Sequence, residues 1–177
     1  MTELLVNTAM GLFTVALHQE RAPTTCAYFA NLARNGELNQ SSIFRILSTS
    51  NQEEHDPCPI HIVQVGRSQL YGSDRHTIEH ESTLQTGISH TRWVVSAARF
   101  DLSVLYGSFF ICMRDEPSLD YGGARQADGQ GFAAFGEVTV GRDVVEAIFN
   151  RAEGSDLLQN GIAVPTIGLR ELKAGSR

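Results

Sequence analysis

The chain has 177 residues, a length typical of one domain that buries its own hydrophobic core, and 42% of its residues are hydrophobic. Charged residues make up 19%, below the usual figure of about 25%, which excludes a disordered chain and argues against a coiled coil. The formal net charge of −6 argues against a nucleic-acid partner, because such proteins carry a basic surface. We therefore expect a single domain over residues 1–177 that binds no nucleic acid.

The chain opens with a predicted β-hairpin. Two apolar runs, Leu4–Val6 and Leu12–Leu17, flank a connection that contains glycine. The hairpin does not resemble a signal peptide, because Glu3 precedes it in place of a basic region and polar residues interrupt it. No segment approaches the roughly 20 apolar residues of a membrane span. We expect a cytoplasmic protein with no membrane partner.

Two helices are predicted further along the chain. The first begins at Pro23 and stops at Asn35 and Gly36, which matches the preference for proline at helix starts and glycine after helix ends. The second follows Gly141, has apolar residues at helical spacing and closes near Gly154. The remaining pattern is that of strands, over Ile43–Leu47, Ile60–Val65, Trp93–Ala97, Phe109–Met113, Phe132–Val138 and Ile167–Leu172.

Eight strand candidates with only two helices do not alternate as β-α-β units. This pattern favours an all-β fold, a closed eight-stranded antiparallel barrel capped by two α-helices, because closure removes exposed strand edges. The polar stretch Arg67–Gln85 is predicted to be a long surface loop.

Five blocks of sequence carry a family resemblance through their joint order and spacing. They are Ile43-Phe44-Arg45-Ile46, Ile62-Val63-Gln64-Val65-Gly66, Gly107-Ser108-Phe109-Phe110-Ile111-Cys112, Asp120-Tyr121-Gly122-Gly123 and the tract Asp128–Val138. In this order they resemble the cyclophilin-type peptidyl-prolyl cis–trans isomerases, and the tract from Asp120 to Gly136 looks most like bacterial members. The resemblance covers nearly the whole chain. It implies the same barrel, no cofactor, and proline-containing peptides or unfolded protein clients as partners, and we expect a monomer.

The chemistry of prolyl isomerisation needs a hydrogen-bond donor rather than a nucleophile. Resonance across the X–Pro amide gives a rotation barrier of about 18–20 kcal/mol, and the prolyl nitrogen regains a lone pair only when the amide is twisted. A fixed donor beside that nitrogen therefore stabilises the twisted state selectively. Arg45 matches the position of the family's catalytic arginine, and we expect it to point away from the face shared by Phe44 and Ile46.

The resemblance also implies the residues that hold the substrate. Gln64 matches the glutamine that binds the peptide backbone, Phe110 matches the phenylalanine of the proline pocket, and Ala98 is expected along the peptide groove. Four further positions occupy places of the family's site but carry other residues, and these are His61, Arg99, Ser108 and Phe132. These departures leave a second reading open, in which the chain is a weak or inactive module that only binds proline peptides.

Other patterns in the sequence favour rival chemistries only weakly. The run from His76 to Glu81 reads H-x-x-E-H-E, similar to an inverted zincin motif, but it lies in a predicted loop and we expect no metal. No nucleophile elbow supports a Ser-His-Asp hydrolase, and the three cysteines form no C-x-x-C pair, so Cys26 near a helix start is expected to pack rather than react. The segment Phe100–Tyr106 is unusually apolar, and we expect it to be an exposed loop that contacts a partner or peptide.

Overall fold

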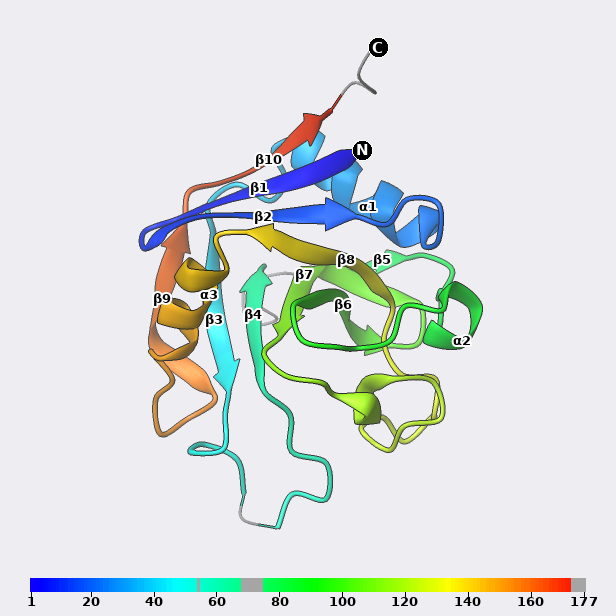
Figure 1. Cartoon of the computed structure of the whole chain (residues 1–177), viewed down its shortest axis with the longest axis vertical. Coiled ribbons are helices and arrows are strands. Elements are labelled where there is room, and N and C mark those ends of the chain that lie inside the picture. The colour runs from blue at the N-terminus through cyan, green and yellow to red at the C-terminus, as the bar shows by residue number, and fades with distance from the viewer. Residues whose placement is uncertain (54, 68–74, 173–177) are drawn as a thin grey trace.

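A computed structural model describes residues 1–53, 55–67 and 75–172 and shows a barrel of antiparallel strands (Figure 1). The strands are β1 (Thr2–Thr8), β2 (Gly11–Leu17), β3 (Ser41–Leu47), β4 (Ile62–Gly66), β5 (His76–Thr77), β6 (Val94–Asp101), β7 (Val104–Cys112), β8 (Ala134–Val140), β9 (Leu157–Val164) and β10 (Thr166–Glu171). The helices are α1 (Pro23–Arg34), α2 (Thr83–Thr86) and α3 (Arg142–Phe149), with one turn of 3₁₀-helix over Pro117–Leu119.

The sheet runs in the order β10-β1-β2-β8-β6-β7-β4-β3-β9, and the two-residue β5 pairs with β7 outside this path. Its two end strands, β9 and β10, are consecutive in the chain and are separated only by Pro165. Proline cannot donate to a strand ladder, so the chain bends there and passes from pairing with β3 to pairing with β1. The amide of Ala9 donates to the Ala163 carbonyl at 2.9 Å across the remaining gap. With β9 and β10 read as one bent strand and β5 set aside, the barrel has the eight strands expected from the sequence.

The interior of the barrel is filled by apolar side chains that alternate along the strands. Phe29 of α1 stacks on Phe135 of β8 with ring centroids 4.5 Å apart, and the edge of Phe109 contacts both rings. The largest fully buried side chains of this inner core include Leu4, Phe13, Phe29, Leu38, Ile43, Ile46, Phe109, Ile111, Phe135, Ile148 and Ile167.

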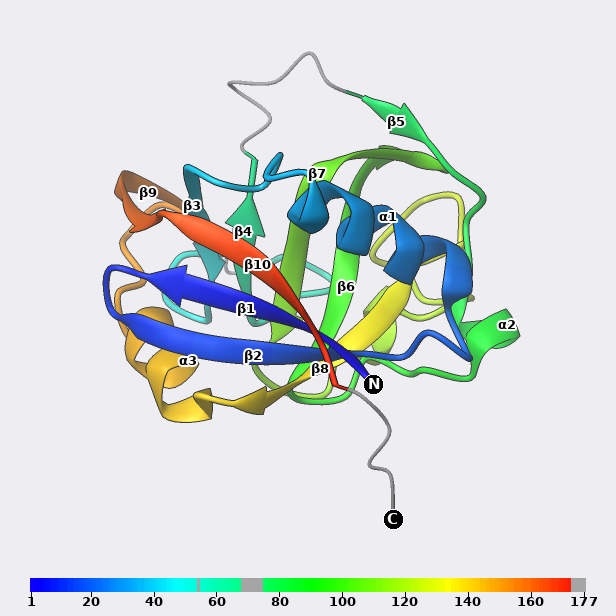
Figure 2. The same cartoon turned by 90° about the horizontal axis from the view of Figure 1, so that it is seen from above.

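The two long helices lie on opposite sides of the β1–β2 hairpin, as Figure 2 shows from above. Helix α1 packs against β10 and β8, and α3 packs against β2 and β4. The first turn of α1 contains no acidic residue, and its N-terminal amides are capped from far along the chain. Glu81 accepts hydrogen bonds from the Thr24 and Thr25 amides at 3.0 and 2.8 Å and from the Thr25 hydroxyl at 2.7 Å. This carboxylate supplies the negative charge that the positive end of a helix dipole favours.

Three expectations about local structure were wrong. The chain has a third α-helix, α2, which begins with a Ser82–Gln85 capping box inside the stretch expected to be a loop; residues 68–74 of that stretch lie outside the described residues. Helix α3 ends at Phe149 rather than near Gly154, and β9 was missed because polar Gln159, Asn160 and Gly161 interrupt its apolar pattern.

A fourth expectation, that the apolar segment Phe100–Tyr106 is an exposed loop, was also wrong. The segment forms the end of β6, a tight turn and the start of β7, and Ser103 takes a left-handed backbone conformation in the turn. Leu105 and Tyr106 are buried, whereas Leu102 at the tip is 40% exposed. Most of the apolar character therefore belongs to packed strand rather than to an exposed loop.

None of the helices in the described part of the chain has the length and apolar character needed to cross a bilayer.

Candidate functional site

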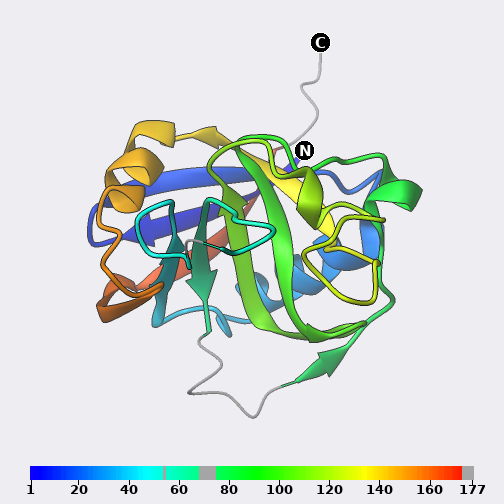
Figure 3. The ribbon, with the colours of Figure 1, turned by 90° about the horizontal axis from the view of Figure 1, so that it is seen from below.

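A pocket of about 180 Å³ lies on the outer face of the barrel, over β3, β4, β6 and β7. Two loop segments, residues 48–61 (of which residue 54 lies outside the described residues) and 114–133, extend from this side of the barrel (Figure 3). A volume of this size suits one ring-sized side chain, since pockets for drug-sized ligands measure about 300–1,000 Å³. Its lining comprises Arg45, Leu47, Ile60, Ile62, Gln64, Ala98, Arg99, Tyr106, Phe110, Leu119, Arg125, Gln126 and Phe132. Six of the eight residues singled out in the sequence therefore meet at one pocket, and His61 and Ser108 do not line it.

A β-bulge at Phe44 determines which way Arg45 points. Ile43 pairs with Val65 and Arg45 pairs with Gln64, so Phe44 is an extra residue without a partner on β4. Side chains alternate along a regular strand, and without the bulge Arg45 would share the inward face of Ile43. The extra residue shifts the alternation, so that Ile43 and Ile46 both enter the inner core and Arg45 lies on the pocket side. Arg45 does point to the outside, as expected. The reason given for it, a regular alternation in which Phe44 and Ile46 share the opposite face, was wrong because of the bulge.

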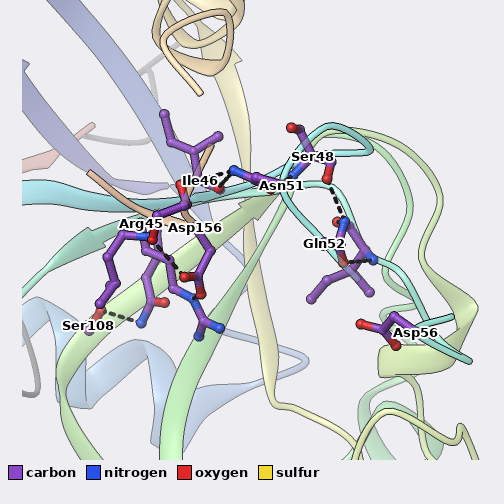
Figure 4. Close-up of polar contacts among 12 residues, drawn as sticks. Arg45, Ile46, Ser48, Asn51, Gln52, Asp56, Ser108 and Asp156 are labelled. Atoms are coloured by element: carbon purple, nitrogen blue, oxygen red, sulfur yellow. Dashed lines mark hydrogen bonds and ion pairs between the residues drawn. The ribbon is translucent and has the colours of Figure 1, made fainter. Parts of the chain in front are cut away.

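The Arg45 guanidinium has an acidic partner that no sequence pattern predicts. Its Nε donates to Asp156 Oδ2 at 2.8 Å, and the two side chains are 33% and 31% exposed (Figure 4). In the described part of the chain, the guanidinium makes no other hydrogen bond or ion pair. The Nη1 and Nη2 groups thus remain available to a ligand in the pocket.

Gln64 is held by two hydroxyl groups, one from Tyr106 in the pocket lining and one from Ser108 behind it. Its Nε2 donates to the Tyr106 hydroxyl at 2.8 Å and to Ser108 Oγ at 3.1 Å, and Ser108 Oγ in turn donates to the Val65 carbonyl at 3.1 Å. Because a serine hydroxyl has one proton, Ser108 can only accept from Gln64, and this fixes the amide nitrogen toward Ser108. The Gln64 carbonyl oxygen is left to accept a hydrogen bond from a bound peptide. Ser108 is fully buried and supports Gln64 from behind.

Aromatic rings form the apolar wall of the pocket. Phe110 and Phe132 meet edge to face with ring centroids 5.3 Å apart, and both line the cavity. The Phe110 ring also stacks on the buried ring of His90, with ring centroids 6.2 Å apart. His90 is held between Asp120 Oδ1, 2.6 Å from Nδ1, and Ser96 Oγ, 2.9 Å from Nε2. These contacts restrict the movement of the Phe110 ring.

The Asp120–His90–Ser96 chain has the connectivity of a hydrolase triad, but its burial excludes that chemistry. Ser96 is fully buried and His90 is 1% exposed, so no substrate reaches the hydroxyl. Burial raises the pKa of Asp120, but hydrogen bonds from the His90 side chain and amide outweigh this effect and hold the pKa below its usual value. The arrangement is a satisfied polar network behind the pocket.

Arg99 lines the pocket, and its side chain is fixed by the loop beside it. The side chain is 3% exposed. Its guanidinium donates from Nε to the Gly131 carbonyl at 3.0 Å and from Nη2 to Asp128 Oδ1 at 2.8 Å, and lies over the Phe132 ring. The Arg99 hydrogen bond lowers the pKa of Asp128, and a hydrogen bond from the Gln130 amide adds to the effect. Gly131 has φ +64°, and a Cβ there would lie 2.4 Å from the Leu119 carbonyl oxygen. Only glycine allows this loop to approach closely enough to fix Arg99.

His61 lies behind the pocket rim and its ring faces away from the cavity. Its Nε2 is 2.7 Å from the Thr49 hydroxyl, its Nδ1 is 3.6 Å from Glu116 Oε1, and its ring is 6.2 Å from that of Phe149. The neighbours Ile60 and Ile62 point into the pocket instead. These two residues could have been found from the sequence, because they share the period-two face of Gln64.

The groups that suggested rival chemistries have other partners. His76 contacts the Tyr28 hydroxyl at 3.0 Å, His80 contacts the Gln130 carbonyl at 3.0 Å and Glu81 caps α1, so the H-x-x-E-H-E side chains diverge. Within the ranges that the structure describes, no three histidine, cysteine or acidic side chains gather at a potential metal site. Burial raises the pKa of the Cys26 thiol to about 12, which leaves it unreactive at neutral pH.

Comparison with known proteins agrees with this architecture and pocket. The model of the family described as cyclophilin type peptidyl-prolyl cis-trans isomerase/CLD matches residues 3–167. The peptidyl-prolyl cis-trans isomerase-like 1 of Aspergillus fumigatus is 33% identical over 120 residues, which cover 67% of this chain and 70% of the relative. The peptidyl-prolyl cis-trans isomerase cyp18 of Streptomyces antibioticus is 25% identical over 175 residues, 98% of each chain.

A solved structure shows the same fold. The cyclophilin type peptidyl-prolyl cis-trans isomerase of Cryptosporidium parvum, crystallised in the presence of the dipeptide Ala-Pro, superposes with a TM-score of 0.73 over 96% of this chain and 99% of that chain at 16% identity. The barrel thus defines a protein of the cyclophilin fold. The chain belongs to the cyclophilin-type peptidyl-prolyl cis–trans isomerases, and prolyl isomerisation is the activity that this membership assigns to it.

Proposed function

We propose that the pocket lined by Arg45, Gln64 and Phe110 accelerates rotation about X–Pro bonds in peptides and unfolded protein clients. The observation that carries the proposal is the convergence on one cavity of a cationic donor, an amide and an apolar wall. The proline ring packs against Phe110, Phe132 and the isoleucines of the rim. Binding of this kind needs no cofactor, because no covalent bond forms or breaks.

The contribution of Arg45 follows from the electronic structure of the amide. In the planar ground states the nitrogen lone pair is delocalised into the carbonyl and accepts hydrogen bonds poorly. In the twisted state the lone pair is localised on nitrogen and accepts a hydrogen bond from a guanidinium N–H. A donor that is stronger toward the twisted state than toward either planar state lowers the barrier. Arginine keeps its charge at all relevant pH values, so the donor is always present.

Gln64 and Ala98 hold the peptide while one side of the bond rotates. The Gln64 carbonyl oxygen accepts from a backbone amide of the substrate, and the small Ala98 side chain lets the substrate backbone approach β6. We propose that the Arg99 side chain acts on the substrate only through the wall it forms with Phe132, because its Nε and Nη2 groups are already bonded.

Replacement of Arg45 tests the assignment. We expect Arg45→Ala to lower kcat/KM for an X–Pro peptide by about 10²–10³-fold, the usual effect of removing one donor to the transition state. Arg45→Lys keeps the charge but loses the planar fork, and we expect it to recover only a small part of the activity. The measurement is exchange NMR or a protease-coupled assay, with circular dichroism to show that the fold is intact.

A module that only binds proline peptides is the rival function. It predicts peptide affinity without faster cis–trans exchange in the wild-type chain, and equal affinity for the Arg45→Ala variant. Absence of faster exchange in the wild-type chain would contradict the isomerase mechanism proposed above. Equal affinity of the Arg45→Ala variant would not, because Arg45 acts on the twisted state. Size-exclusion chromatography of the same samples tests the expected monomer.

A further inference from the structure

The Arg45–Asp156 contact raises the question of what a carboxylate does beside the proposed donor. Asp156 stands immediately before β9, and 111 residues separate it from Arg45 in the sequence. An ion pair in which both side chains are about one-third exposed contributes little to folding stability. The carboxylate also partly neutralises the guanidinium that attracts the substrate. Its presence is explained more readily by an effect on the orientation of Arg45.

Asp156 is itself held rigidly. Its carbonyl accepts from the Ile46 amide at 2.8 Å, and its Oδ1 accepts from the Leu157 amide at 3.0 Å, which leaves Oδ2 for Arg45 Nε. The two carboxylate oxygens therefore have different partners, and the carboxylate cannot rotate without breaking one of these bonds.

Asn51 fixes the same segment from the neighbouring loop. Its Nδ2 donates to the Ile46 carbonyl at 2.8 Å and to the Ser155 carbonyl at 3.2 Å, and its Oδ1 accepts from the Ser48 amide at 2.9 Å. Figure 4 shows Asn51 beside Ile46, with a dashed line for the hydrogen bond between them. Arg45 and its carboxylate partner thus belong to one hydrogen-bonded unit.

We infer that Asp156 is a positioning residue for prolyl isomerisation, which anchors Arg45 by Nε so that Nη1 and Nη2 are presented to the pocket. The inference rests on the proposed function of Arg45. A long arginine side chain samples many rotamers when free, and a catalytic donor that must meet the prolyl nitrogen gains from being fixed before the substrate twists. Anchoring at Nε uses the donor farthest from the tip and leaves the tip free to bind.

The test compares Asp156→Ala and Asp156→Asn with a matched control. Glu137→Gln is the control because Glu137 forms a similar ion pair with Arg142, at 2.7 Å and with side chains 44% and 39% exposed, but does not line the pocket. Rates from exchange NMR over a range of X–Pro peptide concentrations separate kcat from KM. Circular dichroism and thermal unfolding report the fold.

We expect Asp156→Ala to lower kcat about tenfold with KM changed less than twofold, because the donor becomes mobile while the proline pocket is intact. Asp156→Asn keeps an oxygen that accepts from Arg45 Nε, and we expect it to retain kcat within about threefold of wild type. Glu137→Gln should match wild type. In the Arg45→Ala background, Asp156→Ala should cause no further loss, because Asp156 acts only through Arg45.

The results distinguish failure of this inference from failure of the proposed function. If the wild-type chain is active and Arg45→Ala is inactive, but both Asp156 variants keep or exceed the wild-type kcat, then Asp156 does not position the donor. If Asp156→Ala lowers activity equally in the Arg45→Ala background, its role is structural and the inference is also overturned. If the wild-type chain itself shows no acceleration, the proposed function fails and the inference fails with it.

Discussion

The two faces of strands β4, β6 and β7 are built from the same stretches of sequence but are packed differently. Inward-facing Val63, Ala97 and Phe109 belong to the inner core, which is filled by interlocking apolar side chains. Outward-facing Ile62, Ala98 and Phe110 belong to a second, smaller cluster that encloses the pocket. Of two adjacent residues in these strands, the inward-facing one therefore stabilises the fold and the outward-facing one forms the pocket.

The outer cluster differs from the inner core in how it treats polar groups. Gln64 is only 3% exposed and Arg99 only 7%, yet both lie on the outer face, each held by hydrogen bonds to groups behind the pocket wall. Buried polar groups of this kind are costly unless they are bonded. The outer cluster contains such bonded polar groups and encloses a cavity, whereas the inner core is filled by apolar side chains.

The neighbours Phe109 and Phe110 provide the largest expected effect. Phe109→Ala removes a fully buried ring, and we expect a loss of about 3–5 kcal/mol in the free energy of unfolding with KM of the surviving enzyme unchanged. Phe110→Ala opens onto a cavity that water can enter, and we expect about half that loss, with KM for an X–Pro peptide raised about tenfold. Urea denaturation and peptide titration measure the two quantities. Equal losses of stability would show that the two faces are not distinct.

Acidification is expected to lower the free energy of unfolding, by less than the Phe109 substitution does. The cause is that three histidines resist protonation in the folded state. Burial is the main cause that lowers the pKa of His18, His61 and His80. In the unfolded chain each histidine has a pKa of about 6.5. As the pH falls below this value the unfolded state binds protons first, so the free energy of unfolding decreases between about pH 7 and pH 5.

Urea denaturation at pH 7.5, 6.5 and 5.5 measures this slope. His61→Asn removes one of the three titrating groups, the one that lies beside the outer cluster. We expect a shallower slope of stability against pH for this variant than for wild type. Stability that rises on acidification, or a slope unchanged by the substitution, would contradict the assignment.

Thiol labelling needs no substitution and compares the inner core with the outer cluster directly. Cys26 lies in the inner core and Cys112 in the outer cluster, both fully buried, and burial raises the pKa of each thiol. Cys58 lies in the 48–61 segment and is partly exposed. We expect a thiol reagent to modify Cys58 rapidly and the other two only after unfolding, as followed by mass spectrometry. If Cys112 reacts at the rate of Cys58, the outer cluster opens far more readily than the core.

The barrel could be predicted because its signals are local. Alternating apolar residues, Pro23 at the first position of α1 and Gly36 after its end, and the two-residue turn between β1 and β2 each act over a few residues. The segment Leu157–Val164 was missed because Gln159, Asn160 and Gly161 interrupt its alternation, and only its pairing with β3 makes it a strand.

The site was predictable where it follows strand periodicity and unpredictable where it depends on distant contacts. Gln64, Ala98 and Phe110 keep the alternation and line the pocket as expected. The bulge at Phe44 has no signature in the apolar pattern around it, although it decides the direction of Arg45. Asp156 carries no local signal at all, since it becomes a partner of Arg45 only when β9 pairs with β3.

The cap on α1 links helix completion to chain synthesis. Because Glu81 supplies the carboxylate for the Thr24 and Thr25 amides, the helix start stays uncapped until the chain has grown past residue 81 and that segment has left the ribosome. This helix is translated before its cap and is thus among the elements that wait for later ones. Its final stabilisation belongs to the same slow stage as the long-range strand pairings that close the barrel.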